Sequence, residues 1–272
     1  MRFASLGSGS EGNALIVEVA VAGGKPSRVM LDCGFGLKEC ESRLARLGIA
    51  PASLAAILVT HEHGDHIGGV VRLARRHDIP IWATHGTLQA VASSALDGLR
   101  IHFCSGHASF SIGAIEVHPY SVPHDAREPI QFVFSDGVRR LGVLTDAGRP
   151  TSHIRDSLDG CDALVMECNH DRALLEASDY PYPLKRRIAG GFGHLSNDVA
   201  AEIVASLDRS RLRRVVAAHL SRQNNTAELA RAALAQATAW MPERIDVADQ
   251  ASGFGWIDLT VGVTAANVLA PD

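Results

Sequence analysis

A cluster of potential metal-ligating side chains follows an apolar run in the segment ILVTHEHGDHIGG, residues 57–69. Three histidines, one glutamate and one aspartate lie between His61 and His66. The preceding run AAILVT, residues 55–60, is typical of a strand buried on both faces of a sheet. Polar groups beside a buried strand are costly unless they are paired or bind a cation. The segment therefore predicts a strand that delivers ligands to one edge of a sheet.

The spacing within this cluster indicates two cation sites. In an extended segment, residues i and i+2 point the same way, so His61 and His63 can converge on one cation. Asp65 and His66 follow one turn later and can reach a second cation. Imidazole and carboxylate ligands suit zinc, manganese or iron. The alternative is a solvated polar loop, but four ligand-type residues at these spacings favour a metal site.

Three further apolar runs end in a group that can act chemically. They end at Asp146 in GVLTD, at Glu167 in ALVME and at His219 in RVVAAH. Together with the segment that ends at His61, four strand-like runs carry such a group at their C-terminal ends.

The order of predicted elements indicates an α+β protein. Strands come first and a mixture of strands and helices follows, twice over. This pattern predicts a single domain, residues 1–272, with two β-plus-α halves of about 1–125 and 126–272, sheet packed on sheet and helices outside. The predicted strands are 2–6, 14–19, 28–34, 55–60, 79–84, 130–135, 138–146, 163–171 and 214–221. The predicted helices are 41–49, 70–78, 87–96, 197–207 and 225–237.

Turn and cap residues give finer expectations. Asp136-Gly137 predicts a type I′ turn between two strands. Ser196 or Asn197 is expected to cap the helix that follows, and the spacing of Asn225 and Glu228 resembles a capping box. The stretch GFGWIDLTVGV, residues 253–263, is expected to add one more strand.

Composition is that of an ordinary soluble globular protein. Hydrophobic residues make up 46% of the chain and charged residues 21%, with a formal net charge of −4. No apolar run approaches the roughly 20 residues that span a bilayer, so no membrane association is expected. Five widely spaced cysteines without a CxxC pair indicate a reducing, cytoplasmic location. The net charge gives no support for nucleic-acid binding, although it can conceal a local basic face. No dimerisation motif is evident, and the oligomeric state stays open.

The segment THEHGDHIGG resembles the HxHxDH signature of the metallo-β-lactamase superfamily. The resemblance implies a four-layer αβ/βα sandwich with a two-metal site at one edge. It also requires a later histidine, a bridging aspartate and a final histidine, which the chain offers in VPHDA, LTDAG and AAHLS. The implied ligands are His61, His63 and His124 for one metal, Asp65, His66 and His219 for the other, and Asp146 as the bridge.

Longer stretches resemble the YycJ/WalJ-type branch of this superfamily. They are LGSGSEGNA, DCG, VPHDAREP, ECNHD, YPLKRRIAGGFGHLSN and HLSRQNN, within residues 1 to about 232, with Cys168 where a serine is expected. The branch implies 5′-to-3′ exonuclease activity on double-stranded DNA, in which a hydroxide shared by two metals attacks phosphorus. The implied metals are manganese or zinc, with iron possible. Asp32 in MLDCG matches an early aspartate that supports the ligand loop.

Further residues are candidates for catalysis and substrate binding. His194 in GFGHLSN precedes a predicted helix N-terminus, which favours phosphate, so it could contact substrate or protonate the leaving oxygen, or merely bond to backbone. His170 follows a strand, and catalysis and simple loop structure are equally favoured there. Asp65 is a catalytic candidate as well as a ligand, and Glu167 is expected to orient a histidine. The candidates for binding substrate phosphate are Ser221, Asn224, Lys185 and Arg186.

Two other functions stay open at this point. The first is a small-molecule phosphodiesterase, thioester hydrolase or lactone hydrolase on the same scaffold, since a fold alone does not fix the substrate. The second is a metal-binding protein without catalysis, which the complete ligand set disfavours. A duplex requirement and a strong salt dependence of binding would favour DNA.

Overall fold

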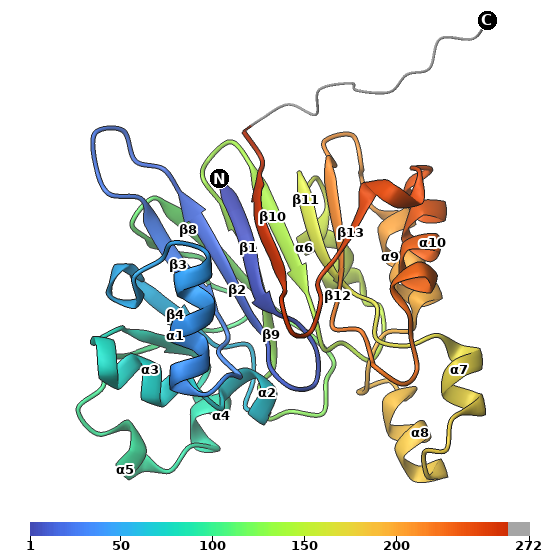
Figure 1. Cartoon of the computed structure of the whole chain (residues 1–272), viewed down its shortest axis with the longest axis horizontal. Helices are drawn as coiled ribbons and strands as arrows, with labels where there is room; N and C mark the ends of the chain where they lie inside the picture. Colours follow the sequence, from blue (N-terminus) through green and yellow to red (C-terminus); the bar gives the residue numbers. More distant parts are fainter. Residues whose placement is uncertain (261–272) are drawn as a thin grey trace, which may run out of the picture.

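A computed structural model describes residues 1–260 as two seven-stranded sheets packed face to face, with helices on the outer sides (Figure 1). Apolar side chains of both sheets, among them Phe3, Val17, Phe132 and Val143, form the central core. Two further cores lie between each sheet and its helices. The predicted α+β sandwich is confirmed.

The first sheet has the strand order β14-β1-β2-β3-β4-β5-β6. The first three strands form the expected antiparallel meander, and β4 to β6 continue it in parallel. The expected C-terminal strand pairs with β1, and residues 261–263 of that stretch lie outside the described residues. The strands are β1 (Arg2–Gly7), β2 (Ala14–Val19), β3 (Ser27–Leu31), β4 (Ala56–Leu58), β5 (Ile81–Ala83), β6 (Ile101–Phe103) and β14 (Phe254–Asp258).

The second sheet has the order β13-β12-β11-β10-β9-β8-β7. Its first four strands in chain order are antiparallel, and β10 to β13 are parallel. The strands are β7 (Phe110–Ile112), β8 (Ile115–Ser121), β9 (Ile130–Ser135), β10 (Arg140–Leu144), β11 (Ala163–Glu167), β12 (Arg214–Ala218) and β13 (Ile245–Val247). The chain thus passes from the first sheet to the second between β6 and β7 rather than near residue 125, and it returns to the first sheet with β14. The assignment of residues 1–272 to a single domain stays a prediction.

Helices cover the outer face of each sheet (Figure 1). Leu44 of α1 and Leu73 of α3 pack against the first sheet, and Ile203 of α9 and Leu234 of α10 pack against the second. On the first side lie α1 (Leu37–Arg46), α2 (Gly64–Ile67), α3 (Val70–His77), α4 (His85–Gln89), α5 (Ser93–Leu96) and the 3₁₀ turn η1 (Pro51–Ser53). On the second lie α6 (Ser152–Leu158), α7 (Arg172–Ala177), α8 (Tyr182–Ile188), α9 (Asn197–Ser206), α10 (Ala227–Thr238) and the 3₁₀ turn η2 (Pro242–Arg244).

The helix predicted over 87–96 and the type I′ turn were wrong. The extended backbone of Ala92 (φ −56°, ψ 130°) separates α4 from α5. A type I′ turn needs positive φ at both central residues, but only Gly137 has one, at 85°. Asp136 instead accepts hydrogen bonds on its side chain from the amides of Val138 and Arg139, which closes a longer loop.

Two helix caps also differ from expectation. Thr226 caps α10 by accepting a hydrogen bond from the Leu229 amide, so the capping residue is one position after Asn225. Ser196 holds the N-cap position of α9 but makes no capping hydrogen bond with its side chain. A cap requires an extended residue immediately before the first helical turn, and tertiary packing decides which residue that is.

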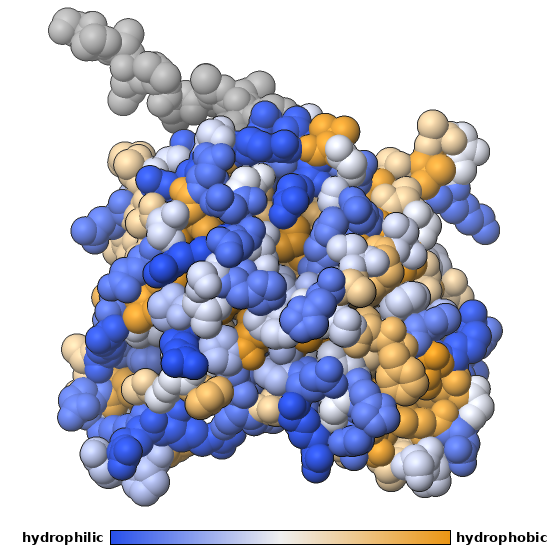
Figure 2. Space-filling view, turned by 180° about the vertical axis from the view of Figure 1, so that it is seen from behind, coloured by the Kyte–Doolittle hydropathy of each residue, from blue (hydrophilic) through white to orange (hydrophobic). Residues whose placement is uncertain are grey.

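The face turned away in Figure 1 is polar over much of its area (Figure 2). Hydrophobic residues gather on the side where α3 to α5 lie, and Leu88, Leu96 and Phe103 line a depression on the described surface there. Within residues 1–260, no helix has the length and apolar character needed to cross a membrane.

Candidate metal centre

The ends of four strands bring the predicted site together at one edge of the sandwich. His61 and His63 follow β4, and Asp65 and His66 lie in the short helix α2. Asp146 follows β10, Glu167 ends β11 and His219 follows β12. The four groups meet at this edge, because His61, Asp146, Glu167 and His219 belong to overlapping sets of ligand atoms.

Strained backbone occurs directly after β3 and β12 and two residues after the end of β10. Asp32, Asp146 and His219 have φ values of 60°, 51° and 56°. Residues other than glycine rarely adopt this left-handed conformation, which costs on the order of 1–3 kcal/mol each and clusters at functional sites. Each side chain is thereby turned toward the same point, where tertiary contacts hold it.

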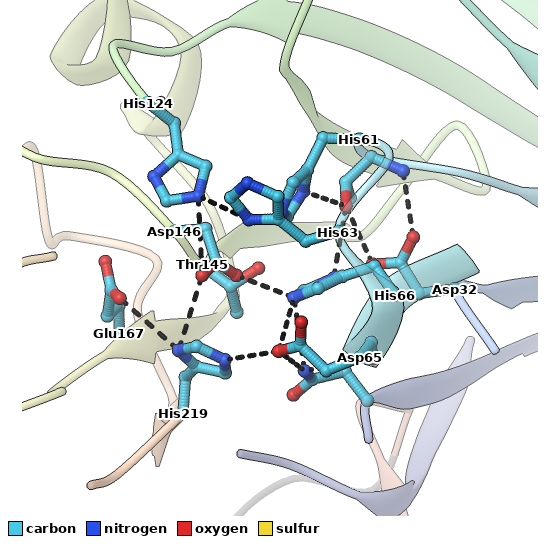
Figure 3. A network of polar contacts seen from close by, with 12 residues as sticks. Asp32, His61, His63, Asp65, His66, His124, Thr145, Asp146, Glu167 and His219 are labelled. Atoms are coloured by element: carbon cyan, nitrogen blue, oxygen red, sulfur yellow. Dashed lines mark hydrogen bonds and ion pairs between the residues drawn. The ribbon is translucent and has the colours of Figure 1, made fainter. Parts of the chain in front are cut away.

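Four groups of potential ligand atoms each lie within 4.8 Å of one another. Two of them match the two triads that the resemblance implies, and Asp146 belongs to groups that contain members of both. Figure 3 shows the side chains of the two triads and of Asp146 pointing toward a common centre. The groups are His61/His63/His124, Asp65/His66/His219, His61/His66/Asp146 and Asp146/Glu167/His194/His219.

The hydrogen bonds of His61 prepare its Nε2 for a cation. Its Nδ1 lies 2.9 Å from Thr60 Oγ1, and Thr60 donates its own proton to Asp32 Oδ2 at 2.9 Å. Nδ1 must therefore carry the proton, and Nε2 keeps its lone pair. Within residues 1–260, the buried Nε2 has no hydrogen-bond partner. Burial also holds the pKa of His61 well below its ordinary value, so the ring is neutral at pH 7.

His124 is prepared in the same way. Its Nδ1 donates to the Gly193 carbonyl at 3.0 Å, which leaves Nε2 facing His63 Nδ1 at 3.2 Å. Burial lowers the pKa of His124. The lone pair of His124 Nε2 is thus directed at the His63 ring, as a cation held between the two rings requires.

His66 and His219 lie beside carboxylates that favour the protonated, positively charged form of each ring. His66 Nδ1 donates to Asp32 Oδ2 at 2.8 Å, and Nε2 lies 3.0 Å from Asp146 Oδ2. Burial alone would lower the pKa of His66, but Asp146 and Asp32 raise it well above its ordinary value. Burial alone would likewise lower the pKa of His219, but Asp146 and hydrogen bonds to Asp65 and Glu167 raise it to about 10. Cations bound here would replace these protons.

Sequence reasoning missed three residues that hold these ligands. Thr60 links Asp32 to His61, as described above. Asn13 donates to the Gly9 carbonyl at 3.0 Å and to Asp65 Oδ2 at 3.2 Å. The signal for Asn13 was its place in LGSGSEGNA, and the signal for Thr60 was its place directly before the histidines.

Asp125 is the third missed residue, and it joins the ligands to α8. Its Oδ1 lies 3.4 Å from His124 Nε2 and 3.8 Å from His63 Nε2. Its Oδ2 lies 2.6 Å from Arg187 Nε. An acidic residue directly after a predicted ligand was the available signal.

A cavity of about 400 Å³ opens over the cluster. His63, Asp65, Asp146 and His219 lie at its wall, together with His194, Asn169, Arg187 and Ser221. The predicted catalytic residues Asp65 and His194 and the predicted phosphate contact Ser221 therefore face one space. Its size suits a terminal nucleotide or a small molecule.

Four other candidates do not line this cavity. Asn224 is buried behind Ser221, and its backbone amide donates a hydrogen bond to Ser221 Oγ at 3.2 Å. Lys185 donates to the Glu176 carbonyl, and the Arg186 guanidinium lies 5.9 Å from the Tyr182 ring centroid. His170 lines a separate pocket of about 160 Å³ that it shares with His194, and burial lowers its pKa to about 4. The roles predicted for these residues stay predictions.

Comparison with known proteins identifies the family. The beta-lactamase superfamily domain matches residues 27–220. The chain belongs to the beta-lactamase superfamily. Within this superfamily it is 34% identical to exodeoxyribonuclease YycJ of Bacillus anthracis, over 87% of this chain and 88% of that protein. It is 33% identical to exodeoxyribonuclease WalJ of Streptococcus pneumoniae, over 84% of this chain and 85% of that protein. The resemblance inferred from the motifs is confirmed.

Solved structures of other proteins share the fold. Zinc-bound PqqB from Methylobacterium extorquens matches with a TM-score of 0.71 and 15% identity, over 95% of this chain and all of that one. The short form of human tRNase Z matches with a TM-score of 0.64 and 17% identity, over 96% of this chain and all of that one. At these identities the likeness concerns the fold alone, which is the metallo-β-lactamase sandwich.

Proposed function

We propose that this superfamily member is a metal-dependent phosphodiesterase that removes nucleotides from the 5′ end of double-stranded DNA. The observation that carries the proposal is the joined set of ligand groups at the base of an open cavity. The substrate class is taken from relatives named exodeoxyribonucleases that are 33–34% identical over most of their length. The free state of all five cysteines in the structure supports the further proposal of a cytoplasmic location.

The donor set suits two divalent cations, with manganese or zinc as the proposed metals and iron possible. We infer that His61, His63 and His124 hold one cation, that Asp65, His66 and His219 hold the other, and that Asp146 contacts both. Bound cations would supply a water of lowered pKa and positive charge beside the phosphoryl oxygens.

His194 is the proposed general acid. Its Nδ1 donates to Glu167 Oε1 at 2.8 Å, and the side chain lines the cavity. Burial alone would lower the pKa of His194, but the hydrogen bond to Glu167 raises it, so the ring keeps its proton to higher pH than an isolated histidine would. A protonated ring in this position can donate to the leaving oxygen of the cleaved phosphodiester.

Ser221 is the proposed phosphate contact at another part of the cavity wall. Its Oγ accepts a hydrogen bond from the backbone amide of Asn224, which leaves the hydroxyl proton free to donate toward the cavity. This bond holds Ser221 in place.

A small-molecule phosphodiesterase is the second candidate, because a cavity of about 400 Å³ is also the size of a typical small-ligand site. The two candidates differ in whether residues outside the cavity contribute to the rate of hydrolysis.

The test compares two substrates with manganese-loaded protein. One is a 5′-phosphorylated duplex labelled at the 3′ end of the same strand, and the other is bis(p-nitrophenyl) phosphate. We expect a ladder of progressively shorter labelled strands, lost in His61→Ala and weakened by added salt. Hydrolysis of the small diester beside an intact duplex would overturn the DNA proposal and leave the small-molecule hydrolase.

A further inference from the structure

A large aromatic side chain stays exposed on the loop that leads into the cavity. Phe192 is 58% exposed and directly precedes Gly193 and His194, which line the cavity. Tyr182, which begins α8, is 72% exposed. One exposed aromatic residue is ordinary, but an exposed ring joined to two residues of the cavity wall suggests a binding surface.

The backbone of Phe192 is fixed although its ring is exposed. Its carbonyl accepts the Asp125 amide at 2.9 Å. Gly148 packs so closely against the loop that a Cβ there would lie 2.4 Å from the Phe192 nitrogen. The next residue, Gly193, holds His124 through its carbonyl. The ring is therefore presented at a set position relative to the ligands rather than on a loose loop.

Each exposed ring has a guanidinium group near it. Arg149 lies 5.7 Å from the Phe192 ring centroid, and Arg186 lies 5.9 Å from that of Tyr182. Neither arginine forms an ion pair with an acidic group of residues 1–260 at 4.0 Å or less, so both charges are available to phosphate. Aromatic rings flanked by such cations are the usual elements of sequence-independent nucleic-acid binding.

Of the two rings, that of Phe192 is the one whose loop adjoins the cavity. Leu184, Arg187 and Ile188 line the cavity at i, i+3 and i+4 spacing, so they mark one face of α8. Tyr182 and Arg186 lie on the opposite face of this helix, because successive helical residues are turned by about 100°. A strand end that leaves the cavity would thus meet Phe192, whereas Tyr182 is an exposed aromatic residue away from this path.

We propose that Phe192 stacks against the terminal base of the DNA strand whose phosphate enters the cavity, with Arg149 at the adjoining phosphate. This inference rests on the proposed nuclease function and adds how the strand end is held. Every base presents a π face, so this contact is independent of sequence.

The test uses Phe192→Ala, Phe192→Trp and the control Phe103→Ala. Phe103 is similarly exposed, at 61%, but it lines the depression at α4 and α5. We expect Phe192→Ala to lower the ratio of kcat/KM for the duplex to kcat/KM for bis(p-nitrophenyl) phosphate by about 5- to 100-fold, mainly through KM. Phe192→Trp should restore the ratio, whereas Tyr182→Ala and Phe103→Ala should leave it unchanged.

A fluorescence measurement reports stacking directly. A duplex with 2-aminopurine at the 5′ terminus and phosphorothioate linkages that resist cleavage is titrated with each metal-loaded protein. Wild type and Phe192→Trp should quench the base, whereas Phe192→Ala should not. Thermal melting of each variant establishes that it is folded.

The outcomes separate the two proposals. A wild-type protein that hydrolyses the small diester but neither binds nor degrades the duplex would overturn the nuclease function itself. Duplex degradation with equal ratios for Phe192→Ala and Phe103→Ala would overturn the stacking contact alone. A lowered ratio that Phe192→Trp does not restore, without quenching by wild type, would also overturn it.

Discussion

The Glu167 carboxylate accepts a hydrogen bond from His194 Nδ1 at 2.8 Å, although the two residues are 27 positions apart. The other carboxylate oxygen, Oε2, accepts the amides of Ala147 and Leu195 at 2.9 and 3.2 Å. Glu167 is fully buried, so neither bond is weakened by competition with water. One buried carboxylate thereby fixes the proposed general acid and the loop that carries Asp146.

Removal of this charge should change the pH dependence of catalysis. Glu167 raises the pKa of His194, so the protonated acid persists to higher pH than an isolated histidine would allow. In Glu167→Gln we expect the loss of activity with rising pH to begin at a lower pH, and kcat to fall about 10- to 100-fold. The pH profile of kcat/KM on duplex DNA checks this. If Glu167→Gln lost activity with rising pH at the same pH as wild type, the assignment of His194 as the general acid would be contradicted.

Metal binding should release protons. The pKa values of His66 and His219 are raised in the metal-free protein, so both rings are charged near pH 7 and must lose a proton to become ligands. We therefore expect affinity for manganese or zinc to rise between pH 6 and pH 8, by up to about tenfold per pH unit for each proton released. Calorimetry in buffers of different ionisation enthalpy counts these protons. An affinity independent of pH would show that other residues bind the metal.

Asp32 should support both the metal site and the fold. It accepts hydrogen bonds from the Thr60 amide, from Thr60 Oγ1 and from His66 Nδ1. In Asp32→Asn the amide group cannot accept all three, so we expect metal affinity to fall about 10- to 100-fold and the free energy of unfolding by about 1–3 kcal/mol. Metal titration and urea unfolding measure the two effects.

Asp78→Asn is the matched control for that substitution. Asp78 also has a positive φ, 52°, but its side chain is exposed. Because asparagine tolerates this conformation as aspartate does, the backbone contribution is the same in both variants. The control should stay within about 0.5 kcal/mol of wild type. Equal effects of the two substitutions would mean that backbone strain, rather than the hydrogen bonds of Asp32, is responsible.

Glu18 should make stability depend on pH at a distance from the metal centre. It lies on β2 between Arg2 of β1 and Arg28 of β3 and forms ion pairs with both. Burial alone would raise the pKa of Glu18, but the two arginines lower it overall. Its contribution is therefore present above the unfolded pKa of about 4.3 and is lost as pH falls through the lower folded value.

Glu18→Gln isolates this contribution. We expect the substitution to lower the free energy of unfolding by about 1–2 kcal/mol at pH 7, with metal affinity unchanged. The difference from wild type should shrink as the pH is lowered below 4. Urea unfolding at several pH values measures it, and a constant difference would show that packing rather than charge is lost.

The spacing of neighbouring residues in the sequence was enough to predict the candidate metal-binding segment and the fold class. The residues from His61 to His66 lie on one short segment, so their spacing alone limits which of them can converge. The meander of β1 to β3 and the strands that end in Asp146, Glu167 and His219 were also predictable, because alternation and apolar runs are properties of neighbouring residues. The remaining ligands became assignable only through the resemblance of these segments to a known superfamily.

Tertiary structure alone decided the contacts between distant segments. Asp32 holds His66 across 34 residues, Asp125 joins His124 to Arg187, and Phe192 lies beside the cavity. None of these pairings follows from spacing, because each depends on which strand ends and loops the packing of two sheets brings together. The same reason explains why Thr226 rather than Asn225 caps α10, and why β7 and β8 belong to the second sheet. Local periodicity determines which elements form, whereas long-range burial determines which of their ends meet.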